Sequence, residues 1–128
     1  MSWIGRNIRW IMILSGALTA TMIYAAIAPD AAMRSMFGET VDGPLAHLLA
    51  RNWGALIALT GGLLIYGALD PAARTAALVT ASASKIFFIA LVVSERERFA
   101  GQQVILGAAA DAAMVLLFLW YLASRPRA

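Results

Sequence analysis

The sequence predicts an all-α fold, an integral membrane bundle of four antiparallel transmembrane helices in a single domain over residues 1–128. The first reason is composition, because 62% of the residues are hydrophobic and 13% are charged, whereas soluble domains have about 25% charged residues. The second is the presence of four apolar segments, each long enough to cross about 30 Å of hydrocarbon. The third is that short polar stretches separate them, so successive helices are expected to run in opposite directions.

The first predicted span covers residues 10–28 and follows two arginines, Arg6 and Arg9. It is long enough that we expect it to stay in the membrane rather than to be removed as a signal peptide. A polar connection follows, and residues 31–37 within it have the pattern of a short amphipathic helix that lies on the bilayer.

The second predicted span covers residues 45–69, with Pro44 near the first helical position, where its missing N–H group costs little. The connection to the third span, 74–93, is so short that these two helices must form a hairpin. The connector 94–98, which contains four charged residues after Ser94, cannot lie in hydrocarbon and therefore ends the third span. The fourth predicted span covers residues 103–123.

Basic residues in the short loops predict the orientation, because they are enriched on the cytoplasmic side of membranes. The side that holds both chain ends has Arg6, Arg9, Arg74, Arg125 and Arg127. The other side has fewer basic residues, Arg34, Arg96 and Arg98, and these are mixed with acidic residues. We therefore expect both termini in the cytoplasm and the protein in the cell inner membrane.

Small residues predict where the helices pack, since helix association in lipid depends on close approach of the backbones. On the second span, small residues recur at every fourth position and share one stripe: Ala50, Gly54, Ala58 and Gly62. On the fourth span, Gly107 is predicted to have the same packing role.

Three ionisable residues lie inside the predicted spans: Arg51, Lys85 and Asp111. Each costs roughly 2.5–3.5 kcal/mol at mid-bilayer on insertion scales, which makes it a candidate functional residue. All three lie about 10–15 Å from the outer ends of their helices, and we expect Arg51 to share the packing stripe and to point into the bundle. The predicted polar site also includes neighbours at compatible depth: His47, Asn52, Trp53 and Tyr24.

Two interpretations of this polar layer remain open. In the first, an Arg51–Asp111 ion pair ties two helices together and has no further role. Long basic side chains can reach the headgroups by themselves, so only Asp111 would need a partner inside the bundle. In the second, the charged residues line a pocket that opens toward the outer face and holds a ligand. Two bases and one acid favour an anionic or electron-rich ligand group, such as a lipid headgroup or the carbonyl of a quinone.

Several classes of function are excluded or disfavoured. Cysteine is absent and there is one histidine, which excludes thiol chemistry and any multi-histidine metal or haem site within one chain. No nucleophile elbow, His-Glu-x-x-His sequence or phosphate-binding glycine loop is present. The basic residues are scattered, which argues against nucleic-acid binding. We therefore predict no catalytic residue and no metal site, and we favour a non-enzymatic role.

The order of features is also informative. A first span and a proline-containing amphipathic loop precede Arg51-Asn52-Trp53-Gly54, which opens a glycine-rich second span; a tight hairpin to Arg74 and then Lys85 follow. This pattern resembles the DoxX-like family of small four-helix bacterial membrane proteins, in its branches of unknown function. The resemblance implies a bundle with an outward-facing polar cavity, and its motif carries over to Arg51, Trp53 and Gly54. Some members are associated with quinone-level redox complexes, others with redox-stress or assembly partners.

Taken together, the sequence predicts a small non-enzymatic membrane protein, an accessory or ligand-binding subunit with a buried polar site in the outer half of the bundle. The first alternative is a quinone-linked redox subunit that acts with a partner, and the second is a small-solute transporter. No cofactor is predicted apart from the quinone of the first alternative. The expected partners are membrane lipid, a quinone or a redox or assembly protein, and a second copy of the chain in a homo-oligomer.

Overall fold

The computed structural model describes residues 3–124 and is all-helical over that range. Its elements are α1 (Trp3–Ala20), α2 (Ile23–Ile27), α3 (Pro29–Phe37), α4 (Pro44–Leu69), α5 (Pro71–Ser94) and α6 (Gln103–Ser124). Four segments are long and apolar enough to cross a membrane: Trp3–Ile27, Pro44–Leu69, Pro71–Ser94 and Gln103–Ser124. The all-α class and the four apolar helices predicted from the sequence are therefore confirmed.

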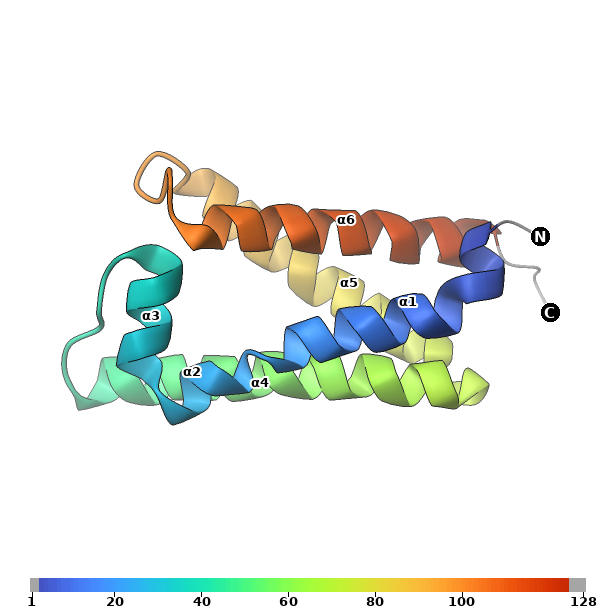
Figure 1. Ribbon diagram of the computed structural model, residues 1–128, viewed down its shortest axis with the longest axis horizontal. Coiled ribbons are helices and arrows are strands. Elements are labelled where there is room, and N and C mark those ends of the chain that lie inside the picture. Colours follow the sequence, from blue (N-terminus) through green and yellow to red (C-terminus); the bar gives the residue numbers. More distant parts are fainter. Residues whose placement is uncertain (1–2, 125–128) are drawn as a thin grey trace.

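The four long helices lie side by side along the long axis of the molecule (Figure 1). The start of α1 and the end of α6 lie at one end, which we call the terminal end. Helix α3 and the loop 95–102 lie at the opposite end, which we call the loop end. Helix α1 packs mainly on α4, α4 also packs on α5, and α5 on α6.

The α4–α5 hairpin turns at Asp70 because both helix ends are capped there. The Asp70 carboxylate accepts a hydrogen bond from the N–H of Ala72, which caps the start of α5. The guanidinium of Arg74 donates to the carbonyls of Gly67 and Ala68 at the end of α4. Asp70 and Arg74 thus satisfy backbone groups that a two-helix turn leaves free.

The first apolar segment differs from the continuous span predicted over residues 10–28. It begins at Trp3 and is interrupted between α1 and α2. At the interruption, the amides of Thr21 and Met22 bond to the carbonyls of Leu18 and Thr19, three residues back, and the Thr21 hydroxyl also donates to Leu18. These three-residue bonds tighten the turn and stop the regular α-helical pattern.

The short amphipathic helix predicted over residues 31–37 is present as α3, over Pro29–Phe37. It crosses the loop end and contacts α2, α4 and α6. Ala32 and Met33 are buried against Ala25 and Ala50, while Phe37 is half-buried. The amphipathic face of residues 31–37 is thus used for packing within the protein.

Close backbone approach occurs at Gly54 of the predicted stripe, and at Gly16 and Gly61 outside it. A Cβ atom at Gly61 would lie 2.5 Å from the backbone O of Gly16, so these two residues let α1 and α4 meet directly. Gly54 is similarly tight against Ala25. The packing role predicted for Gly62 and Gly107 is wrong, because a Cβ atom at either position would meet nothing within 4 Å.

From the predicted stripe, Ala50 is buried and Ala58 is half-buried. The stripe fails beyond Ala58 because an α-helix has 3.6 residues per turn. A four-residue repeat therefore drifts around the helix and leaves the interface.

The core is divided into separate clusters at the two ends. At the terminal end, α1, α4, α5 and α6 bury a large apolar cluster that includes Met12, Leu64, Leu78 and Phe118. Smaller clusters at the loop end surround Met33 and Val104. The lining of the cavity described below includes residues packed in or against all three clusters.

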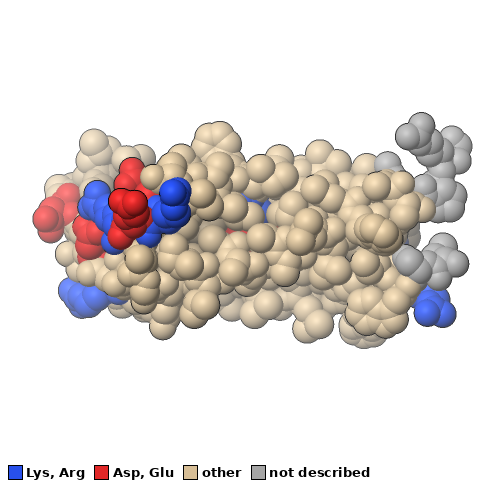
Figure 2. All heavy atoms as spheres, turned by 90° about the horizontal axis from the view of Figure 1, so that it is seen from above, with Lys and Arg blue, Asp and Glu red and all other residues tan. Residues whose placement is uncertain are grey.

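Charge is distributed unevenly over the surface. The face in Figure 2 is almost entirely uncharged along its middle, and acidic and basic side chains gather at the loop end. A long uncharged middle is what contact with lipid acyl chains requires, since charged groups are costly in hydrocarbon.

Candidate functional site

A partly open cavity of about 250 Å³ lies between the helices, next to the interruption between α1 and α2. Its polar lining is Thr19, Thr21, Thr60, Ser84, Lys85 and Asp111. Its apolar lining includes Met22, Met36, Trp53, Phe88 and Met114. Ligand sites generally combine an apolar lining with a few convergent polar groups, so this cavity is the candidate site.

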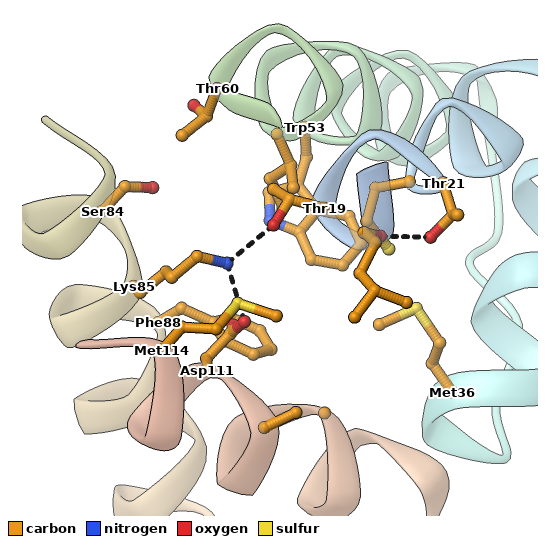
Figure 3. A pocket seen from close by; sticks show the side chains of 15 residues that line it. Thr19, Thr21, Met36, Trp53, Thr60, Ser84, Lys85, Phe88, Asp111 and Met114 are labelled. Carbon is orange, nitrogen blue, oxygen red and sulfur yellow. Dashed lines mark hydrogen bonds and ion pairs between the residues drawn. The ribbon is translucent and has the colours of Figure 1, made fainter. Parts of the chain in front are cut away.

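Lys85 is the centre of the polar part of the cavity. It is 5% exposed, although it carries an ammonium group in the middle of a helix long enough to span a membrane. Its Nζ donates to Oδ1 of Asp111 at 2.7 Å and to Oγ1 of Thr19 at 3.0 Å (Figure 3). The ion pair therefore joins α5 to α6, and the threonine links both to α1.

Thr19 accepts this bond through a lone pair of its hydroxyl oxygen, while its hydroxyl hydrogen is used elsewhere. Its Oγ1 donates to the carbonyl of Ser15 at 2.7 Å, one turn earlier in α1. That bond orients a hydroxyl lone pair toward Lys85. Thr19 lies one residue before the end of α1, so the interruption of the first segment occurs directly beside the buried ion pair.

The ion pair keeps unused hydrogen-bonding capacity. An ammonium group has three N–H donors, and over residues 3–124 Lys85 uses two of them. In the same part of the chain, Oδ2 of Asp111 makes no hydrogen bond, and the Asp111 side chain is 21% exposed. The cavity thus offers one donor and one acceptor side by side.

Aromatic rings border the cavity toward the loop end. Trp53 and Phe88 line the cavity, with ring centroids 6.3 Å apart. Phe37 packs on Trp53 at 6.1 Å and on Phe99 at 5.1 Å, which extends the cluster into the 95–102 loop. The side of the cavity near the loop end is therefore built of flat, apolar surfaces.

Arg51 is not part of this site, and its predicted orientation into the bundle is wrong. The residue is exposed, and its Nε donates to the carbonyl of Ala26 in α2 at 2.9 Å. It lies along a separate surface groove with His47 and Asn52. The ion partner of Asp111 is therefore Lys85, not Arg51 as the first interpretation assumed.

Of the other residues predicted for the polar site, Trp53 lines the cavity, and Gly107, which was predicted for helix packing, lines it as well. His47 is half-buried, with Nε2 2.8 Å from Oδ1 of Asp30 and Nδ1 2.8 Å from the carbonyl of Gly43. Asn52 is exposed, as is Tyr24, and neither lines the cavity. Apart from Tyr24, the residues predicted to form one polar layer therefore lie at two separate sites, the central cavity and the surface groove with Arg51.

Sequence reasoning also missed residues, of which Thr19 is the most important. Its signal is present in α1, where Met12, Ser15, Gly16 and Thr19 repeat at helical spacing and are all buried. A hydroxyl on such a stripe is a natural partner for a charge buried in lipid. No group of three acidic or histidine side chains that could hold a metal ion occurs within residues 3–124.

These features define a class of protein: a multi-pass, all-helical membrane protein with a partly open cavity between its helices, bordered by a largely buried ion pair. Comparisons of the chain with protein-family models, with curated proteins and with solved structures find no match.

Proposed function

We propose that this protein is a non-enzymatic membrane protein that binds a small ligand in the central cavity, as an accessory or ligand-binding subunit. One observation carries the proposal. The Lys85–Asp111 pair borders the cavity with one N–H donor and one carboxylate oxygen that have no partner within residues 3–124.

The competing interpretation is a purely structural ion pair, now between Lys85 and Asp111. Desolvation makes buried ion pairs costly, and apolar residues of similar volume often replace them without loss of stability. A pair at this depth that only held two helices together would gain little over apolar packing. Its position on a cavity wall therefore supports a binding role.

The chemistry of the lining indicates the class of ligand. Because Arg51 lies elsewhere, the site contains one base and one acid, which favours a neutral ligand over an anion. Such a ligand needs a hydrogen-bond acceptor for Lys85 and an apolar body to contact Trp53 and Phe88. Ligand pockets usually have volumes of about 300–1,000 Å³, so this cavity suits a small molecule or the head of a larger amphiphile.

The second candidate function is a quinone-linked redox subunit that acts with a partner. A ring that carries carbonyl groups meets both requirements, and the Lys85 ammonium lies among aromatic side chains that would contact it. We also propose that the chain is related to the DoxX-like family, and that relationship would agree with this candidate. Activity of this kind would belong to the complex with the partner.

A small-solute transporter is the least supported candidate. Transport would need a path from the cavity to the terminal end. Met12, Leu64 and Phe118 are fully buried there and fill the space between the helices.

We further propose that successive spans are antiparallel and that the protein lies in the cell inner membrane with both termini in the cytoplasm. The supporting observation is the concentration of basic residues without acidic neighbours at the start of α1, where Arg6 and Arg9 are exposed. The loop end mixes both signs of charge. In this orientation the cavity lies nearer the outer face.

Native mass spectrometry tests the binding function, with solvent extraction to identify what is bound. The wild-type protein is compared with Asp111→Asn and with Ala110→Leu, which narrows the cavity without altering the ion pair. Glu39→Gln is the matched control, because it removes a carboxylate of the exposed Glu39–Arg98 pair. We expect one small molecule on the wild type and the control, and loss of it in both cavity variants.

The opposite result is equally clear. If the wild type carries no ligand and Ala110→Leu raises the unfolding temperature, the cavity is a packing defect and the ion pair is structural. The mass of an extracted ligand separates the two leading candidates, because a quinone has a characteristic mass and absorbance.

A further inference from the structure

The groove that contains Arg51 lies apart from the central cavity, on the outer surface of α4. Its lining includes Ala26, Pro44, His47, Leu48, Arg51 and Asn52. No residue is shared with the lining of the central cavity. We propose that this groove binds the phosphate headgroup of an anionic membrane phospholipid.

The first step is the hydrogen-bonding state of Arg51. A guanidinium has five N–H donors, and within residues 3–124 only Nε is used, by the carbonyl of Ala26. That carbonyl is free because the chain leaves helical geometry at Ala28, with φ −132° and ψ 72°. The bond to Ala26 explains the position of the side chain and leaves its Nη donors toward the groove.

The second step is charge. Two acidic residues act on His47 in this groove: Asp30, whose Oδ1 is 2.8 Å from Nε2 of His47, and Asp42. In the part of the chain that the structure describes, Arg51 makes no ion pair with an acidic side chain. The Asn52 amide also has no hydrogen-bond partner there. The groove therefore combines a fixed positive charge with a neutral donor, and a phosphate oxygen complements both.

The third step is depth. Arg51 lies about 10 Å along α4 from Pro44, and α4 is about 39 Å long, more than the roughly 30 Å of hydrocarbon. The overhanging ends of α4 thus reach the headgroups, and a long arginine side chain near the boundary extends to phosphate level. The exposed side chains of Leu48 and Leu49 provide an apolar surface for the acyl chains in the same groove.

The test compares phosphatidylglycerol with phosphatidylcholine of the same acyl chains, added to the detergent-purified protein and measured by native mass spectrometry. Both lipids offer a phosphate to Arg51, but only phosphatidylcholine also brings a cationic choline close to the guanidinium. We therefore expect the wild type to retain phosphatidylglycerol about tenfold better, because the like charges repel. Arg51→Gln should abolish this preference, and Asn52→Ala should reduce it. Arg96→Gln, an exposed loop arginine, should leave it unchanged.

Other arms of the test separate the alternatives. Asp111→Asn should keep the lipid preference, so failure of the central cavity as a ligand site leaves this inference testable. Equal retention of both lipids by the wild type would overturn the inference even if Arg51→Gln does not fold. Displacement of phosphatidylglycerol by millimolar inorganic phosphate would also overturn it, because free phosphate would then be the ligand.

Discussion

Two ion pairs in this protein have nearly the same length and very different surroundings. Nζ of Lys85 lies 2.7 Å from Oδ1 of Asp111, and Nη2 of Arg98 lies 2.8 Å from Oε1 of Glu39. The first pair has side-chain exposures of 6% and 21%, and the second of 61% and 50%. The second is also bidentate, since Nε of Arg98 donates to Oε2 of Glu39.

The comparison shows that geometry alone does not rank these contacts. The Arg98–Glu39 pair joins two loops at the loop end, where water and salt screen the charges and each side chain loses freedom. In the Lys85–Asp111 pair, the ammonium is almost fully buried and the carboxylate is mostly buried, so water screens these charges far less. Removing one partner of a buried pair leaves the other charge uncompensated, and this strongly lowers the free energy of unfolding.

The largest expected effect is therefore that of Asp111→Ala. The substitution leaves the Lys85 ammonium buried with a single partner, the hydroxyl of Thr19. We expect a loss of about 3–5 kcal/mol in the free energy of unfolding. The measurement is denaturant unfolding of the protein in mild detergent, beside Glu39→Gln, which should change little.

A double variant sharpens this result. Lys85→Met with Asp111→Leu removes both charges and keeps the apolar volume, so most of the lost stability should return. We expect this double variant to be stable but not to bind the ligand. The result would separate the role of the pair in stability from its role in binding. An Asp111→Ala variant as stable as Glu39→Gln would show that burial does not distinguish the two pairs.

A second, smaller effect follows from the same contrast between buried and exposed positions on one helix. Gly61→Ala places a methyl group 2.5 Å from the backbone of α1, whereas Gly62→Ala places it where nothing lies within 4 Å. We expect the first to cost about 1–3 kcal/mol from overpacking. The second should be neutral or stabilising by up to about 1 kcal/mol through helix propensity. Thermal unfolding of both variants measures the difference, and equal effects would contradict the α1–α4 contact at Gly16.

The sequence was a good guide to the helices and a partial guide to the site. Length and hydropathy define apolar helices because lipid leaves few alternatives for the backbone. Depth along the helix was also enough to place Lys85 and Asp111 at similar levels. It failed for Arg51, because depth does not determine the direction in which a side chain points.

The direction of Arg51 depends on a feature that hydropathy does not detect. The chain leaves helical geometry at Ala28, which frees the carbonyl of Ala26, and Arg51 turns toward that carbonyl. The interruption at Thr21 and Met22 was missed for a related reason, since apolar composition continues through it. Thr19 appeared unimportant until its neighbours in space were known.

The smallest expected effect concerns the exposed pair and depends on pH. The hydrogen bond from Arg98, with the charge of its guanidinium, holds the pKa of Glu39 below its usual value of 4.5. A lowered pKa in the folded state means that the pair stabilises the protein above the usual value and loses this contribution as pH falls through the lowered pKa. Glu39→Gln should therefore be slightly less stable than the wild type at neutral pH and equal to it in acid.

The measurement is the difference in unfolding temperature between the wild type and Glu39→Gln at each pH. The other carboxylates titrate in both proteins, so their effect cancels in this difference. The difference should also shrink at high salt, since exposed charges are screened over about 10 Å at 0.1 M ionic strength. A difference that persists in acid would mean that Glu39 contributes through contacts other than its charge. A difference as large as that of Asp111→Ala would reverse the ranking of the two pairs, and burial could then not be the property that separates them.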